Sequence, residues 1–317
     1  MRHVKVIPVT QPLRFMFYEL SQVTFQIANN VNLITRFDIA LTLTIMKLTL
    51  PLRGWKNLQL TWLGAAGFKV DTGEGATLLI NPYLSRPALA YPFLPIQLAD
   101  LAPVDEIFLT DGRFDHALDT PALARQTGAI VHAVEPVCQR LIGQGVSAQN
   151  LENVIPQTPK RVGSLSWQAF SSRTNQTASL PAVRQLIRNL QMPAHLGDLV
   201  RAWPPSEEVA YAFKIDGLSI VHFSSADWGQ AEVSNLRPDL ALLPVEHNPD
   251  TSAASARLAA RLQPKVVIPH HWDNYFPPLS ELSDLTKFET TLNTLAPQVR
   301  VYKPVIGRSF DPITLLY

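Results

Sequence analysis

From residue 58 onward, short apolar runs alternate with polar, glycine-containing connections, a pattern typical of β-strands. LQLTWLG, GFKVDT and ATLLINP predict a meander of three antiparallel strands. Further single strands are predicted for VDEIFLT, AIVHAV, SLSWQAFSS, PDLALLPV, KVVIPHH and VRVYKPVI. EVAYAFKIDGLSIVHFSS predicts two strands joined at Asp216-Gly217, which is the signature of a hairpin.

Helical spacing fills the intervals between several of these strands. In HALDTPALARQTG, Leu118, Ala122 and Leu123 share one face, and Gly128 marks the C-terminal end of the predicted helix. VCQRLIGQG, SAASARLAARL and SELSDLTKFETTL predict further helices. A meander followed by strand–helix units, in two halves, predicts a β-sandwich with helices on its outer faces. The polar segment 173–205 is either a lid that reads substrate or a solvated helix pair.

Composition narrows the class of protein. With 317 residues, of which 46% are hydrophobic and 17% charged, the chain suits a globular protein with a sizeable core. The formal charge is +1 and no basic run contains interleaved aromatic residues, so nucleic-acid binding is not expected. Cys138 is the only cysteine, which excludes an intramolecular disulfide and thiolate-based zinc sites. These features favour a reducing, cytoplasmic location.

Residues 1–45 differ from the rest of the chain. They are apolar but irregular, and charges at Arg14, Glu19, Arg36 and Asp38 interrupt them. No uncharged apolar stretch reaches the roughly 18 residues that a membrane span needs, and no small-residue cleavage site follows a short apolar region. We therefore expect an N-terminal extension of uncertain structure over residues 1–45, no transmembrane segment, and one domain over residues 46–317.

The segment TDGRFDH, residues 110–116, ends a predicted buried strand with a cluster of charged residues. Together with TWLGAAGFKVDTGEGATLLINPYLSRP, PDLALLPV and KVVIPHHWDNYFPPL, it resembles the metallo-β-lactamase superfamily of metal-dependent hydrolases. The resemblance covers roughly residues 58–305 in matching order, and it is closest to the branch whose chains end in Pro-x-His-Trp-Asp. It implies an α/β (α+β) fold: a metallo-β-lactamase-like αββα sandwich of two mixed β-sheets flanked by helices.

That family carries H-x-H-x-D-H after a strand. Side chains at i and i+2 of a strand end point the same way, so two histidines can share a first metal, while the Asp and last His turn toward a second. Here the positions of the first two histidines hold Asp111 and Arg113, whereas Asp115 and His116 are retained. The H-x-H-x-D-H pattern is thus degenerate in the half that serves the first metal.

Later ligand positions are also altered. The family's intermediate histidine should fall near Thr174, and its bridging aspartate is either Asp227 or, in another alignment, Ser225. His271 matches the last histidine, and Asn81 stands where the family usually has an aspartate. The resemblance therefore implies one divalent metal, Zn, Mn or Fe, on Asp115, His116, Asp227 and His271 with an open position for water.

Arg113 decides how the first site is interpreted. Its permanent positive charge either takes the place of the first metal, paired with Asp111 and Asp115, or swings out to solvent. Asp115 is the candidate catalytic residue. The candidate substrate-binding residues are His247, His270 and Trp272.

Two functions remain open. The first is metal-dependent hydrolysis of an ester, lactone or phosphodiester, using one metal at a degenerate site. The alternative is a non-catalytic pseudoenzyme of the same fold, without a metal, that binds a ligand or a protein. We expect a small-molecule substrate or ligand as the partner, and the sequence specifies neither its identity nor the oligomeric state.

Overall fold

The computed structural model describes residues 58–87, 90–171, 194–226, 228, 233, 235–246, 249–274 and 281–317. All of them lie within one compact unit, Trp55–Tyr317. The predicted N-terminal extension and the site candidates Asp227, His247 and Thr174 fall outside the described residues. Within the described residues, no helix combines the length and the apolar character that crossing a bilayer requires.

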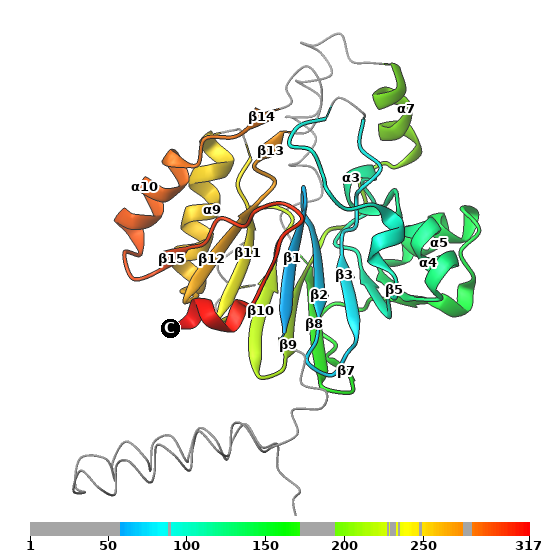
Figure 1. Cartoon of the computed structure of the whole chain (residues 1–317), viewed down its shortest axis with the longest axis horizontal. Coiled ribbons are helices and arrows are strands. Elements are labelled where there is room, and N and C mark those ends of the chain that lie inside the picture. Colours follow the sequence, from blue (N-terminus) through cyan, green and yellow to red (C-terminus); the bar gives the residue numbers. More distant parts are fainter. Residues whose placement is uncertain are drawn as a thin grey trace, which may run out of the picture. The chain divides into compact units, whose positions relative to one another are not determined.

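The first sheet of the described residues has the strand order β16-β1-β2-β3-β4-β5-β6. Its strands are β1 (Gln59–Gly64), β2 (Gly67–Asp71), β3 (Thr77–Ile80), β4 (Glu106–Phe108), β5 (Ile130–Ala133), β6 (Leu151–Asn153) and β16 (Ser309–Phe310). Strands β1, β2, β3 and β5 are labelled in Figure 1. The predicted meander is confirmed, because β1, β2 and β3 pair antiparallel in sequence. From β3 to β6 the pairing becomes parallel, so the sheet is mixed.

The second sheet has the order β15-β12-β11-β10-β9-β8-β7. Its strands are β7 (Lys160–Val162), β8 (Leu165–Ser171), β9 (Val209–Ile215), β10 (Leu218–His222), β11 (Leu240–Pro244), β12 (Val266–His270) and β15 (Arg300–Val301). The β9–β10 hairpin is confirmed, and its turn places Asp216 at φ 51° and Gly217 at φ 81°. Strands β10, β11, β12 and β15 are parallel, so this sheet is mixed as well.

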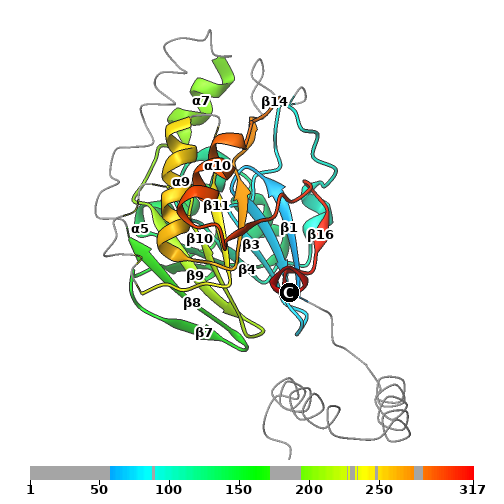
Figure 2. The same ribbon diagram turned by 90° about the vertical axis from the view of Figure 1, so that its left-hand side faces the viewer.

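Alternating side chains explain why the sheets form layers. On β11, Leu240 and Leu242 belong to the apolar core between the two sheets, whereas Ala241 and Leu243 pack toward the helices outside. The helices are α3 (Phe114–Ala117), α4 (Thr120–Thr127), α5 (Glu135–Gly143), α7 (Ala194–Ala202), α9 (Pro249–Leu262) and α10 (Thr286–Leu295). Helices α4 and α5 pack on the first sheet, and α9 packs on the second with α10 beside it (Figures 1 and 2). The result is the predicted αββα sandwich.

Three of the predicted elements have different bounds in the structure. The helix predicted from His116 is divided into α3 and α4, because Pro121 lacks the N–H that would continue the α3 ladder and instead starts a new helix. The helix predicted over residues 280–292 begins only at Thr286, whose N–H bonds to the Asp284 carboxylate. Before it, β14 (Glu281–Leu282) pairs with β13 (Asp273–Asn274). The predicted last strand is limited to Arg300–Val301.

Candidate metal centre

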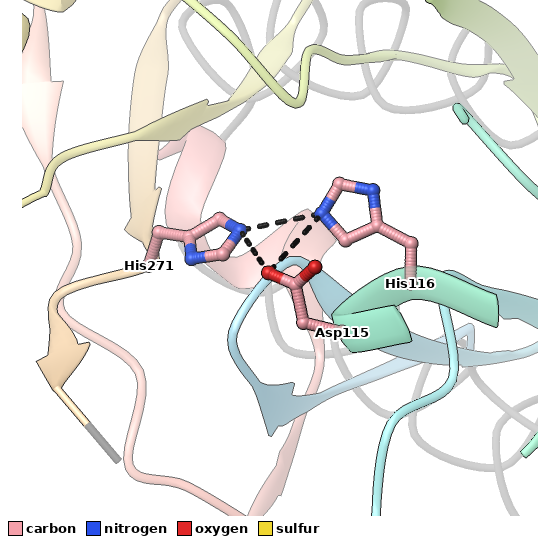
Figure 3. A group of neighbouring side chains, drawn as sticks. All are labelled: Asp115, His116 and His271. Carbon is pink, nitrogen blue, oxygen red and sulfur yellow. Dashed lines mark hydrogen bonds and ion pairs between the residues drawn. The ribbon is translucent and has the colours of Figure 1, made fainter. Parts of the chain in front are cut away.

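The candidate site lies where strands of both sheets end. The chain leaves β4, passes Thr110 and turns into α3, which carries Asp115 and His116, while His271 follows β12 of the other sheet (Figure 3). Asn81, at φ 44°, fixes the first segment: its side-chain amide donates to Thr110 Oγ1 at 2.8 Å and its oxygen accepts from Thr110 N at 2.9 Å. The Asn81 side chain thus stabilises the turn at Thr110 and does not serve as a metal ligand.

Asp115, His116 and His271 converge on one point (Figure 3). His116 Nε2 and His271 Nε2 lie 3.4 Å apart, and each lies 3.9 Å from Asp115 Oδ2. In a tetrahedral site with bonds of about 2.05 Å, neighbouring ligand atoms are about 3.3 Å apart. The three side chains therefore fit one divalent metal after movements of a few tenths of an ångström.

Hydrogen bonds position the His116 ring, and burial acts on the His271 ring. His116 Nδ1 lies 3.1 Å from Asp111 Oδ1 and 3.2 Å from Thr110 Oγ1, so a proton on Nδ1 is shared with these oxygens and the Nε2 lone pair faces the triad. Burial lowers the pKa of His271 to about 3 against the opposing effect of Asp115, which keeps this ring neutral. His271 also has a φ of 59°, a conformation that L-residues adopt at a cost.

Arg113 is turned inward, with only 16% of its side chain exposed. Its Nε and Nη2 lie 2.9 and 2.8 Å from Asp111 Oδ2, and its backbone N–H donates to Asp111 Oδ1 at 2.8 Å. Nη2 also lies 3.4 Å from His116 Nε2, a long contact for a hydrogen bond. Nη1 has no hydrogen-bond partner in the described part of the chain. Asp111 and Arg113, which the resemblance aligns with the first two histidines, therefore form a guanidinium–carboxylate pair, and a guanidinium is not a metal ligand.

Charge pairing keeps the two aspartates of the site ionised. Burial opposes ionisation, but Arg113 and His116 outweigh it and hold the pKa of the Asp111 carboxyl far below its usual value. At Asp115, burial likewise raises the carboxyl pKa, and the permanent positive charge of Arg113 is among the causes that lower it below its usual value. Burial also opposes the charge of Arg113, yet Asp111, Asp115 and Glu208 raise the pKa of its guanidinium. The centre is thus a network of buried, compensating charges.

Two further carboxylates near Arg113 were missed by sequence reasoning. Glu208 precedes β9 and accepts a hydrogen bond from Ser224 Oγ at 2.7 Å, and Glu246 follows β11. Burial raises the pKa of both carboxyls although Arg113 opposes it. Ser225, the alternative for the bridging position, also hydrogen-bonds Glu208. In the sequence, each of these glutamates is visible only as an acidic residue next to an apolar strand. Neither has the spacing to other ligand residues that would mark a metal or catalytic site.

The other sequence candidates lie beside the triad rather than in it. His270 is fully buried, donates from Nε2 to Phe223 O at 3.0 Å, and stacks on His222 with ring centroids 4.9 Å apart. Trp272 stacks on Trp62 at 5.2 Å. Both therefore make contacts within the core, and their assignment to substrate binding stays a prediction.

Two mixed sheets between helices, with a candidate metal centre at their strand ends, define a metallo-β-lactamase-like protein. Residues 59–271 match the profile of the β-lactamase superfamily domain, and the chain belongs to this family. Among curated relatives, a UPF0173 metal-dependent hydrolase of Polynucleobacter asymbioticus is 25% identical over 230 residues, which is 68% of this chain and 74% of the relative. The UPF0173 metal-dependent hydrolase of Myxococcus xanthus is 29% identical over 261 residues, 76% of this chain and 81% of the relative.

Solved structures show the same fold. The metallo hydrolase Igni18 from Ignicoccus hospitalis superposes with a TM-score of 0.57 at 19% identity, covering 80% of this chain and 98% of its own. An isothiocyanate hydrolase from Delia radicum gut bacteria gives a TM-score of 0.55 at 17% identity, with the same coverage of 80% and 98%. At these identities the likeness concerns the fold alone.

Proposed function

We propose that the protein is a one-metal hydrolase in which Asp115, His116 and His271 hold a single Zn, Mn or Fe ion and Arg113 acts in place of the first metal. The substrate class is an ester, lactone or phosphodiester. The observation that carries this proposal is the spacing of the three ligand atoms, 3.4 and 3.9 Å, beside an inward-facing guanidinium. Asp227 remains a candidate fourth ligand. The names of the curated relatives, metal-dependent hydrolases, support the same chemistry.

A bound divalent metal would supply a Lewis acid that lowers the pKa of a coordinated water toward 7. Asp115, whose side chain is 13% exposed and whose carboxyl pKa is lowered, would orient this water and accept its proton. The guanidinium of Arg113 would donate N–H groups to the substrate oxygen on which negative charge develops. Asp111 fixes the guanidinium by pairing with Nε and Nη2. His116 and His271 would contribute imidazole nitrogen ligands through Nε2.

The charges of the site permit a metal beside Arg113. Two unit charges about 4 Å apart interact by about 4 kcal/mol at an effective dielectric near 20, and a divalent ion doubles that repulsion. Asp111 lies 2.8 Å from Arg113 Nη2 and compensates its charge, so a metal meets a nearly neutral pair. Asp115, Glu208 and Glu246 add three more carboxyl groups to the same network. A divalent cation would bring this acidic centre closer to neutrality.

Metal analysis of purified and reconstituted protein tests the proposal. We expect one equivalent of metal in the wild type, and at least a 100-fold loss of affinity together with loss of hydrolysis in His116→Ala and Asp115→Asn. Asp239→Asn is the matched control, because Asp239 precedes β11 at the end opposite Glu246 and pairs with Lys265. A wild-type protein that takes up no metal after reconstitution would refute the proposal and leave the non-catalytic binding protein as the better description.

A further inference from the structure

The segment Tyr83–Arg86, which follows β3, contacts both of the chain segments that carry the metal-ligand candidates. On the α3 side, the backbone N–H groups of Leu84 and Ser85 donate to Asp119 Oδ2 at 2.5 and 2.9 Å. The Tyr83 ring packs edge-on against Phe114 with centroids 5.8 Å apart, and Phe114 immediately precedes Asp115 in the chain. This end of the segment is therefore anchored to the helix of Asp115 and His116.

The other end of the segment is anchored to the His271 side by a buried ion pair. Arg86 Nη1 lies 2.9 Å from Asp273 Oδ2, and the two side chains are 5% and 0% exposed. Both Asp273 oxygens lie 2.9 Å from Ala65 N, and Ala65 O accepts a hydrogen bond from His271 N at 3.0 Å. Arg86 thus reaches the backbone of His271 through two intermediate residues.

Space around this pair is filled. A Cβ on Gly64 would lie 1.9 Å from Arg86 Nη2 and 2.7 Å from Asp273 Oδ2, so the guanidinium lies directly on the β1–β2 turn. Trp62 donates from Nε1 to the same Ala65 oxygen at 3.0 Å and stacks on Trp272, the residue after His271. The contact therefore leaves little freedom to the loop that carries His271.

A buried ion pair is a weak source of stability, because desolvation offsets much of the attraction and apolar replacements of similar volume are often neutral or stabilising. The location of the Arg86–Asp273 pair, next to the backbone of His271, matters more for the site than its contribution to stability. His271 has a left-handed φ of 59°, which the surrounding structure must impose, and the Arg86–Asp273 pair lies within the contacts that impose it.

We propose that Tyr83–Arg86 is a brace that sets the distance between His271 and the Asp115–His116 helix, with Arg86 as its positioning residue. The consequence for metal binding rests on the proposed function, but the positioning of His271 does not. Arg86 touches neither substrate nor metal in this proposal. It acts through Asp273 and Ala65 on the His271 backbone.

The experiment uses the full chain in metal-free and Co²⁺-loaded form. Without metal, Arg86→Met should accelerate hydrogen exchange at the His271 and Ala65 amides while the β9–β10 hairpin amides keep their protection. With metal, the same variant should lose about 10- to 100-fold in Co²⁺ affinity, the usual effect of removing a partner that orients a ligand. Its Co²⁺ absorption bands, which report coordination geometry, should change. Arg86→Lys should restore part of the loss, because a lysine can still reach one Asp273 oxygen.

Lys265→Met is the control, since it breaks the ion pair of Lys265 with Asp239 and should leave all three readouts unchanged. Should Arg86→Met fail to fold, Asp273→Asn replaces it, because the amide oxygen still accepts from Ala65 N while the charge pair is lost. Wild-type exchange, affinity and spectrum in the folded variant would overturn the brace. If the wild-type chain binds no metal, the one-metal hydrolase fails, and the exchange measurement alone decides the brace.

Discussion

Arg113 and any metal in the triad compete for the same nitrogen, because Nη2 lies 3.4 Å from His116 Nε2 and that lone pair must bind the metal. The guanidinium cannot lose its proton, and Asp111 holds it in place through Nε and Nη2. Metal binding therefore requires the Arg113–His116 contact to lengthen while the Arg113–Asp111 pair persists. At the level of single residues, the proposed function thus places an exchangeable metal ion beside one fixed cation, the Arg113 guanidinium.

Removing the Arg113 guanidinium should have opposite effects on metal binding and on catalysis. Arg113→Ala should bind metal more tightly, by about tenfold or more, because repulsion is lost and Asp111 is left uncompensated. The same change should lower kcat by about 100-fold or more, because a donor to the developing charge is missing. Metal titration and steady-state kinetics measure the two effects, and Arg201→Ala, which removes a 73%-exposed guanidinium, is the control. Unchanged metal affinity, or unchanged turnover, in Arg113→Ala would show that Arg113 does not stand in for a metal.

At the scale of elements, the β1–β2 turn is shaped by what lies against it. Gly64 has φ 84°, Ala65 has φ 44°, and the turn presents an N–H to Asp273 and a carbonyl to His271. Because a Cβ at Gly64 would enter the space of Arg86, glycine is needed for room as well as for conformation. The turn thus connects the meander to the ligand-bearing loop of the other sheet.

Gly64→Ala should therefore destabilise the protein by more than conformational strain alone. Gly217 is the matched position, because its φ of 81° is similar and a Cβ there would meet nothing within 4 Å. Gly217→Ala should cost about 1–2 kcal/mol, the usual penalty for a left-handed alanine. Gly64→Ala should cost clearly more and should also weaken metal binding, as measured by denaturant unfolding and metal titration. Equal unfolding free energies for the two variants would mean that the Arg86 side chain can move away from the new Cβ without destabilising the fold.

Local patterns predict strands and helices well but not the contacts between distant segments. The meander, the Asp216-Gly217 hairpin and the glycine end of α4 follow from alternation and turn chemistry, which act within a few residues. The family resemblance predicted Asp115 and His116 from the H-x-H-x-D-H segment and His271 from the PHHWD segment, and the fold brings these three residues together. The Arg86–Asp273 pair and the placement of Glu208 near Arg113 join residues far apart in the chain, and no spacing rule reaches that far.

At the scale of the whole molecule, a pair of buried imidazoles links the two sheets beside the metal centre. His222, at the end of β10, donates from Nε2 to Ala66 O in the β1–β2 turn at 2.9 Å. It stacks on His270, and the Phe68 ring of the first sheet meets both rings edge-on at 5.9 and 5.8 Å. Burial lowers the pKa of His222 to about 3, so this contact between sheets exists with neutral rings.

The stability of the metal-free protein should consequently fall as the pH is lowered from about 6.5 toward 3. An unfolded histidine takes up a proton near pH 6.5, whereas folded His222 resists protonation until about pH 3, so the unfolded state binds more protons throughout that window. Each such histidine lowers the unfolding free energy by about 1.4 kcal/mol per pH unit, and the loss stops below the folded pKa. Urea unfolding at pH 7, 6, 5 and 4 measures the slope. In His222→Gln, which cannot titrate, the slope should be shallower by about one proton even though the protein is less stable at pH 7. An identical slope in variant and wild type would mean that His222 is protonated in the fold, and that the link between the sheets does not depend on a neutral ring.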